Sequence, residues 1–316
     1  MTPEINCKIV SMGDLVVDFN IGVKSLPISP DDHQLVHGVQ FEPGGAGNFL
    51  IAGRHLGANM TALGVVGADI YGSEMLGVFD TKGIETRDII VQSSGTTTLV
   101  FTLSDKRGRH VFLGRIGEGP QVIFEESWKD AIRSADAVHA FGYTLQETRL
   151  ADAFMAAMKF AQANGVPVFF DPGPHIRNVP FEERQMVLRF CNTLILTEDE
   201  IPLLKPDSKG YQDARDLLSD SVTKVVVKRG RKGCVAYAAQ GEVSHEGFKV
   251  DEVDHAGAGD SFAAALIIAL IRKFSLQEAL EIANAMGAAK VQKFGSGTQV
   301  PTRDEMQSVL GHTVVF

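Results

Sequence analysis

Residues 253–260, VDHAGAGD, decide the fold of this 316-residue chain, together with the apolar run SFAAALIIALI at residues 261–271. Small residues in a row before about three turns of strong helix formers predict a tight loop that opens onto a helix N-terminus. Gly257 and Gly259 let backbone N–H groups converge on one point, and the helix dipole adds positive charge there. Such a helix end is suited to binding a phosphate.

Asp260 closes this loop, and its carboxylate has two interpretations. It is either a helix N-cap, a role that Asp fills often, or a group that faces a second substrate. In the second case it takes a hydroxyl proton while the helix end holds the charge of a transferring phosphoryl group. The stretch alone leaves both interpretations open.

Residues 254–260, DHAGAGD, resemble the D-T-x-G-A-G-D signature of the ribokinase-like (PfkB) family of carbohydrate kinases, with His255 where threonine is usual. The resemblance implies that Asp260 is the catalytic aspartate and that N–H groups of Gly257, Ala258 and Gly259 bind phosphate. It implies ATP-dependent phosphorylation of a primary hydroxyl of a small sugar, such as ribose, fructose or 2-keto-3-deoxygluconate. A Walker A motif is absent, so phosphate binding is expected at this helix end and at a glycine loop near residue 230.

Composition limits the class of protein. The formal charge is −9 and 44% of the residues are hydrophobic. The one short basic group, residues 228–232, argues against a nucleic-acid or membrane surface and favours a small-molecule substrate. Three isolated cysteines indicate a reducing compartment. No signal peptide and no run of 18 apolar residues is found, and a cytoplasmic location is expected.

Strands and helices alternate through most of the chain. Strands are predicted at 8–12, 61–66, 137–141, 166–170, 194–196 and 224–227, and helices at 147–164 and 276–293. Repeated βα units predict an α/β fold with a doubly wound, mostly parallel sheet, whose ligands lie at the carboxyl ends of the strands.

Four further β-rich runs do not alternate with helices, at 15–22, 34–42, 96–103 and 109–113, the last two joined by a turn at 105–108. They predict a small separate sheet. By resemblance this sheet is a lid formed by residues 14–43 and 95–115. Residues 1–13, 44–94 and 116–316 are then the α/β domain. Exposed edges of the lid predict a homodimer.

Sugar contacts are expected at the first strand and at the first glycine-rich turn. Asp18 is either a solvated strand residue or, by resemblance, a ligand of sugar hydroxyls. Gly44, Gly45 and Asn48 are similar to the family's G-G-x-x-x-N pattern, one residue shorter, and the alternative for Asn48 is a helix cap. Arg115 either points at the substrate or lies at the lid hinge.

Nucleotide contacts rest on weaker motifs. Thr197-x-x-Glu200 matches a capping box and, by resemblance, the family's N-x-x-E motif, in which the glutamate acts through water on Mg²⁺. Asp171 precedes Gly173, which stands where the family has asparagine, and either orients the phosphoryl region or caps a turn. Further positions implied by the resemblance are Lys228, Gly230, Gly233 and Asn284 for ATP, and Asp254 for K⁺.

Three rival functions are weighed. A nucleoside kinase of the same superfamily would add an apolar or aromatic wall, and Phe101, Phe112 and Tyr143 do not decide this. The departures at His255, Gly173 and Thr197 keep open a catalytically silent sensor of sugar or nucleotide. A dehydrogenase is disfavoured because the glycine-rich loop lies near the C-terminus and lacks G-x-G-x-x-G.

Overall fold

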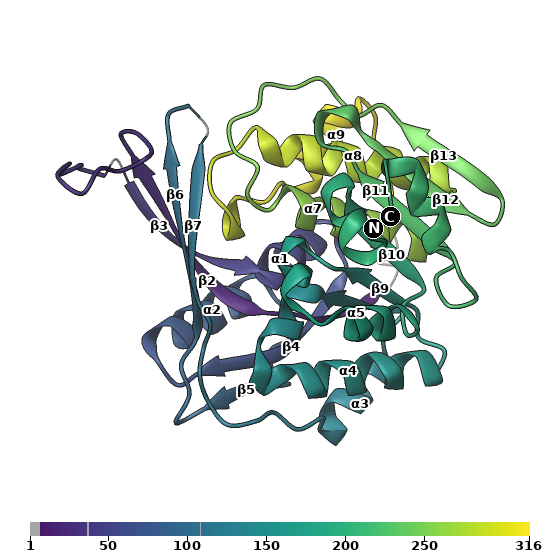
Figure 1. Ribbon diagram of the computed structural model, residues 1–316, viewed down its shortest axis with the longest axis horizontal. Helices are drawn as coiled ribbons and strands as arrows, with labels where there is room; N and C mark the ends of the chain where they lie inside the picture. The colour runs from purple at the N-terminus through teal and green to yellow at the C-terminus, as the bar shows by residue number, and fades with distance from the viewer. Residues whose placement is uncertain (1–6, 37, 108) are drawn as a thin grey trace.

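A nine-stranded sheet forms the centre of the computed structural model, which describes residues 7–36, 38–107 and 109–316 (Figure 1). Its strand order is β13-β12-β11-β10-β9-β8-β1-β4-β5. Strand β12 pairs antiparallel with both β11 and β13, and the other neighbouring strands pair parallel. The strands are β1 (Lys8–Met12), β4 (Asn59–Gly67), β5 (Ile89–Gln92), β8 (Ala137–Phe141), β9 (Val168–Asp171), β10 (Thr193–Thr197), β11 (Lys224–Lys228), β12 (Cys234–Ala238) and β13 (Gly241–His245). The predicted doubly wound, mostly parallel sheet is confirmed.

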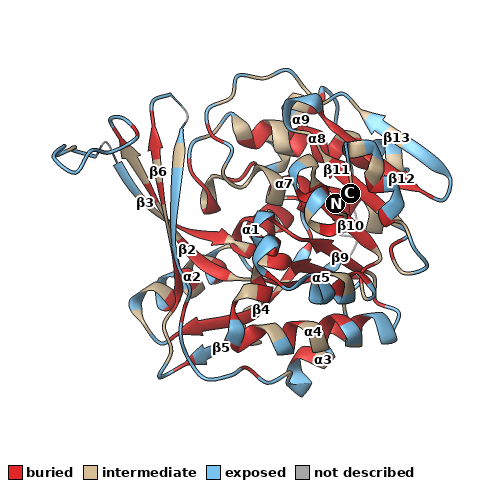
Figure 2. Cartoon of the chain, in the orientation of Figure 1, coloured by how far each residue is buried: buried red, intermediate tan, exposed pale blue. Residues whose placement is uncertain are grey.

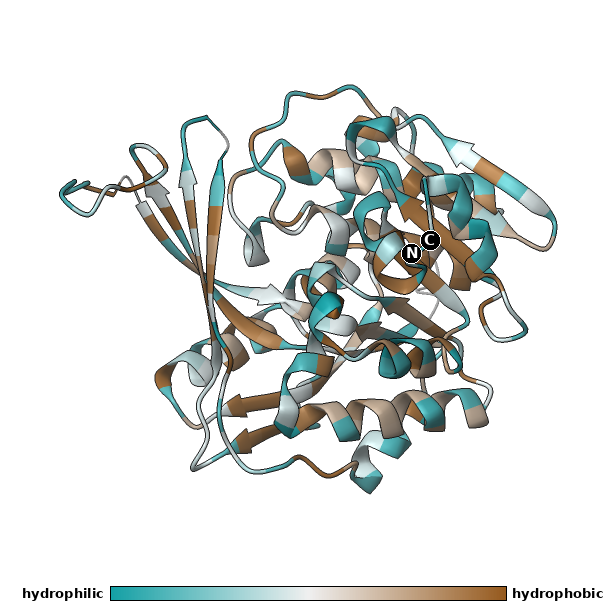
Figure 3. Cartoon of the chain, in the orientation of Figure 1, coloured by the Kyte–Doolittle hydropathy of each residue, from teal (hydrophilic) through white to brown (hydrophobic). Residues whose placement is uncertain are grey.

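Helices cover both faces of this sheet. One face packs against α1 (Ala46–His55), α2 (Ile70–Thr81), α7 (Ala258–Ile271), α8 (Leu276–Val291) and α9 (Arg303–Leu310). The other face packs against α3 (Glu126–Arg133), α4 (Thr148–Ala163), α5 (Phe181–Leu188) and α6 (Ile201–Leu204). The inner strands are apolar and buried (Figures 2 and 3), as strands covered on both faces must be.

A second sheet of four strands stands apart from the first (Figure 1). Its order is β3 (Gly38–Gly45), β2 (Leu15–Val23), β6 (Thr98–Asp105) and β7 (His110–Arg115). The predicted small sheet is therefore confirmed, while its role as a lid stays a prediction. The strand predicted at 34–42 begins too early, because residues 34–36 lie outside any strand; residue 37, Gly108 of the predicted turn and residues 1–6 lie outside the described residues.

The helix-cap alternatives considered for Asn48 and Asp260 are wrong. Helix α1 begins at Ala46 with Gly45 as its N-cap, so Asn48 lies inside the first turn. Gly257 is the N-cap of α7, so Asp260 is the third residue of that helix and not its cap. Gly257 has φ +76° and Gly45 φ +51°, left-handed values that glycine adopts at little cost. Neither the Asn48 nor the Asp260 side chain is therefore used to cap its own helix.

A helix long and apolar enough to span a membrane is not found among the described residues.

Candidate active site

Two neighbouring pockets lie at the carboxyl ends of the parallel strands, where a doubly wound sheet binds its ligands. The larger pocket has a volume of about 460 Å³ and the smaller one about 210 Å³. Lys228, the last residue of β11, lines both. Of the residues predicted for the site, the larger pocket contains Asp18, Gly45, Asn48, Arg115, Asp171, Glu200, Gly257 and Asp260, and the smaller one contains Thr197, Gly230, Gly233, Ala258, Gly259 and Asn284.

Asp260 lies in the first turn of α7 and faces the larger pocket. Asn48 Nδ2 donates a hydrogen bond to its Oδ2 at 2.8 Å. Burial raises the pKa of Asp260 to about 6; the hydrogen bond from Asn48 opposes this rise, and the Asp171 carboxylate adds to it. A carboxylate with this pKa is ionised near neutral pH yet basic enough to accept a proton.

Asn48 holds Asp260 in place. While its amide nitrogen bonds to Asp260, its Oδ1 accepts a hydrogen bond from the backbone N–H of Gly297 at 2.6 Å. Both functional atoms of the amide are therefore committed to protein groups. The side chain lines the pocket, but a role in orienting the carboxylate fits its contacts better than the predicted role of holding the sugar.

Asp18 lies on β2 and also faces the larger pocket. Its Oδ2 accepts a hydrogen bond from Ser296 Oγ at 2.7 Å. Burial raises its pKa to about 7, while the bond from Ser296 lowers it. Gly44 lines neither pocket; a Cβ placed there would come within 2.1 Å of Asp18 Oδ1, so this glycine makes room for the carboxylate.

Lys228 links the two pockets electrostatically. Its Nζ donates to Asp171 Oδ2 at 2.6 Å, and a Cβ on Gly259 would lie 3.4 Å from the same Nζ. Burial lowers the pKa of Lys228, but the carboxylates of Asp171 and Glu200 outweigh it, so the net shift is upward. The ammonium group therefore stays charged beside the N-terminus of α7, which strengthens this anion site.

Glu200 completes the predicted capping box with Thr197, whose backbone N–H donates to Glu200 Oε2 at 2.8 Å. The same side chain is buried and lines the larger pocket near Asp171. Burial raises the pKa of Glu200, and Lys228 opposes the rise. Two buried carboxylates that face one pocket are oxygen donors of the kind that Mg²⁺ prefers, so the residues fit this ion.

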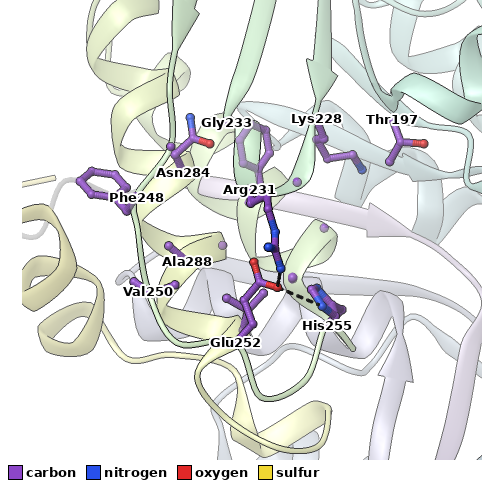
Figure 4. Close-up of a pocket in the computed structure, with 17 residues that line it drawn as sticks. Thr197, Lys228, Arg231, Gly233, Phe248, Val250, Glu252, His255, Asn284 and Ala288 are labelled. Atoms are coloured by element: carbon purple, nitrogen blue, oxygen red, sulfur yellow. Dashed lines mark hydrogen bonds and ion pairs between the residues drawn. The ribbon is translucent and has the colours of Figure 1, made fainter. Parts of the chain in front are cut away.

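The smaller pocket is mostly apolar (Figure 4). Phe248, Val250, Ala288 and Val291 line it. Asn284 Nδ2 is bonded to the Leu280 carbonyl at 2.8 Å, so its amide oxygen is the group left for a ligand.

Charged residues gather at one side of the smaller pocket. Arg231 Nη2 lies 2.6 Å from Glu252 Oε2, and His255 Nε2 lies 3.6 Å from the same oxygen, as the dashed lines in Figure 4 show. His255, which departs from the family pattern, thus meets an acid and leaves the anion site unobstructed.

Asp254 is the one predicted metal ligand that lines neither pocket. Its Oδ1 accepts the backbone N–H of Ala256 at 3.1 Å and its Oδ2 accepts that of Gly295 at 2.8 Å. These bonds fix the loop that leads into α7.

Sequence reasoning missed a group of buried charges in the larger pocket. Asp14 and Glu147 both line it, and Arg149 Nε donates to Glu147 Oε1 at 2.5 Å. Burial raises the pKa of Asp14 well above its usual value, and Glu147 raises it further. The turn Gly13-Asp14 after the first strand was the available signal for Asp14, whereas nothing in the sequence links Glu147 to it.

Several known proteins are similar to this chain over nearly its whole length. The model of the pfkB family of carbohydrate kinases matches residues 6–303. The ATP-dependent ribose-1-phosphate kinase of Halopiger xanaduensis is 29% identical over 303 residues, 96% of this chain and 98% of its own length. Fructokinase-2 of Zea mays is 27% identical over 321 residues, 96% of this chain and 94% of its own. An E. coli protein assigned as ribokinase II, in complex with ATP and Mg²⁺, superposes with a TM-score of 0.81 at 25% identity, covering 96% of this chain and 99% of that one.

Proposed function

Since the chain belongs to the pfkB family of carbohydrate kinases, we propose that this sugar kinase transfers the γ-phosphoryl group of ATP to a primary hydroxyl of a small sugar. One observation carries the proposal. The Asp260 carboxylate, oriented by Asn48, lies at the N-terminus of α7, where an ammonium group and backbone N–H groups meet. A base and an anion site side by side are what phosphoryl transfer to an alcohol requires.

Asp260 accepts the proton of the sugar hydroxyl, whose oxygen then attacks the γ-phosphorus in line. The Ala258 N–H already donates to the His255 carbonyl. The backbone N–H groups of Gly259 and Asp260 and the Lys228 ammonium therefore stabilise the charge that develops on the phosphoryl oxygens.

Asp18, with Arg115 at the pocket rim, binds the sugar hydroxyls. Six acidic side chains line the larger pocket and suit a neutral polyol, whose hydroxyl groups donate to carboxylates.

The smaller pocket takes the adenine and ribose of ATP between the loop of Gly230 and Gly233 and the helix that carries Asn284. Asp171 and Glu200 would hold Mg²⁺, directly or through water, and the ion when bound neutralises charge on the phosphate oxygens. Thr197 shapes this end of the pocket by capping the turn after β10.

A nucleoside remains a second candidate substrate because of one observation. Phe112 from the small sheet and Tyr143 from the 3-10 turn after β8 both line the larger pocket, so its wall is partly aromatic. Such a wall would stack on a base.

A screen for ADP release over ribose, fructose, 2-keto-3-deoxygluconate, tagatose phosphate and several nucleosides tests both candidates. We expect turnover with one of the neutral sugars. Turnover with nucleosides alone would favour the second candidate, and turnover with none would contradict the kinase. Tight binding of sugar and ATP without turnover would instead identify a sensor.

We also propose that the four-stranded sheet is a lid that pairs with a second copy in a homodimer. Its outer strand β7 exposes Phe112 and Leu113, with exposed fractions of 62% and 54%. Apolar groups of this size on an edge strand are protected by a partner. Light scattering of the purified protein tests the dimer. A cytoplasmic location is proposed too, supported by the free, buried state of Cys7, Cys191 and Cys234, and cell fractionation tests it.

A further inference from the structure

Lys290, in the last turn of α8, is a charged group that the proposed reaction does not use. Its side chain is fully buried, with an exposed fraction of 0%. Its Nζ donates to the carbonyl of Lys293 at 2.9 Å. Taking an ammonium group out of water costs several kcal/mol unless other charges compensate, roughly as for any buried ion. A lysine in this place therefore needs a compensating partner.

The Asp254 loop lies against the segment that carries Lys290. Backbone N–H groups of Val253 and Asp254 both donate to the Val291 carbonyl, at 2.6 and 3.1 Å, and Gly295 N–H donates to the Asp254 carboxylate. Residues 290–295 thus fold around Asp254. Burial lowers the pKa of Lys290 to about 8, and Asp254 is the carboxylate that most strongly opposes this shift, followed by Asp260.

A potassium ion does not fit at Asp254. Both carboxylate oxygens already accept backbone N–H groups, of Ala256 and Gly295, and the nearby Lys293 carbonyl already accepts the Lys290 ammonium. Hard cations bind where several oxygen atoms are free to coordinate them.

We propose that the Lys290 ammonium is the resident cation of the Asp254 loop, so that this kinase needs no monovalent metal ion. The ammonium compensates the negative charge of the Asp254 carboxylate. It thereby stabilises the loop conformation that leaves the N-terminus of α7 accessible to phosphate. It acts through the loop and touches no substrate, so it is a positioning residue. The turnover test below rests on the proposed function, whereas the binding test does not.

Turnover is first measured for the wild-type protein in KCl, NaCl and tetramethylammonium chloride at equal ionic strength. We expect rates within about twofold of one another, since equal ionic strength keeps general screening constant. The affinity for a non-hydrolysable ATP analogue, from calorimetry without sugar, should be the same in the three salts. A wild-type rate or affinity several-fold higher in KCl would overturn the inference.

Lys290→Met then removes the charge but keeps an apolar chain. Removing one partner of a buried charge pair strongly destabilises a protein, so circular dichroism with a thermal melt checks that the variant is folded before its affinity is compared. In tetramethylammonium chloride we expect about a tenfold loss of nucleotide affinity, from an uncompensated buried carboxylate. KCl or NH₄Cl should restore part of the loss.

Lys293→Met is the matched control, because this partly exposed lysine pairs with Glu305 instead. It should keep wild-type affinity in every salt. A Lys290→Met protein that is folded and binds the nucleotide as the wild type does would refute the role of the ammonium. If no sugar is phosphorylated at all, the affinities still decide the matter, so this failure is separate from that of the proposed reaction.

Discussion

The two pockets of this protein share a wall at Lys228 but differ in how they are built. The larger pocket is lined by acids, and burial raises the pKa values of four of them, Asp14, Asp18, Glu200 and Asp260. The smaller pocket is lined mostly by glycines and apolar side chains. Its charged and titratable side chains are the shared Lys228, Glu252, His255 and Arg231, and that of Arg231 is 78% exposed. We therefore expect the chemical step in the pocket where charges lose their water, and recognition by shape in the other.

This difference predicts that changes in the larger pocket affect the chemical step and that changes in the smaller one affect nucleotide affinity weakly.

Asp260→Asn should have the largest effect. The amide cannot accept the hydroxyl proton, so we expect kcat to fall by about 10³, within the range typical of general-base catalysis. The dissociation constants of sugar and nucleotide, from calorimetry, should change little. A variant that turns over at the wild-type rate would show that Asp260 is not the base. The proposed difference between the two pockets would then be wrong.

Asn48→Ala should follow in size. Loss of a hydrogen bond to a charged group costs about 2 kcal/mol, which corresponds to roughly 30-fold in rate. The pKa of Asp260 should rise, because the hydrogen bond from Asn48 stabilises the charged carboxylate in the wild type and is absent in the variant. Stopped assays over a pH series would show the acid limb of kcat moving upward. A lower kcat with an unmoved limb would mean that Asn48 acts on the sugar instead.

The wild-type pH profile is the third test. Because burial raises the pKa of Asp260 to about 6, the ionised fraction falls as the pH drops through that value. We expect kcat to decrease about tenfold between pH 7 and pH 5, as for a base that must be deprotonated. In kcat/KM a further step near pH 7 should come from Asp18, and Asp18→Asn should remove that step only. A flat profile would contradict both assignments.

Arg231→Ala should have the smallest effect. An exposed ion pair contributes at most about 1 kcal/mol, so we expect no more than a fivefold rise in KM for ATP and an unchanged kcat. Initial-rate measurements at saturating sugar give both constants. A large fall in kcat would show that the smaller pocket takes part in the chemical step.

Much of this architecture was predictable because it depends on local patterns. Strand β8 was predicted with the bounds that it has, and the apolar run behind Asp260 marked α7. Helix starts were predicted less well. A capping asparagine and a capping aspartate look the same in sequence as residues inside the first turn, and only the left-handed backbone at Gly45 and Gly257 separates the two.

Contacts that set the chemistry were beyond sequence reasoning. Asn48 and Asp260 are 212 positions apart, and Asp18 and Ser296 are 278 apart, yet each pair is joined by a hydrogen bond. Asp14 and Glu147, which both line the larger pocket, are also distant in sequence, and no motif connects them.

The order of residues alone determined the alternation of strands and helices and the loop before α7, because periodicity and glycine spacing act over short range. The prediction that Asp260 is the functional acid came from the resemblance to the family signature. The tertiary structure decided which groups lie beside that acid, and therefore its pKa, its orientation by Asn48 and the placement of the Lys290 charge near Asp254. Burial and long-range contacts arise only once the sheet and its helices have packed together.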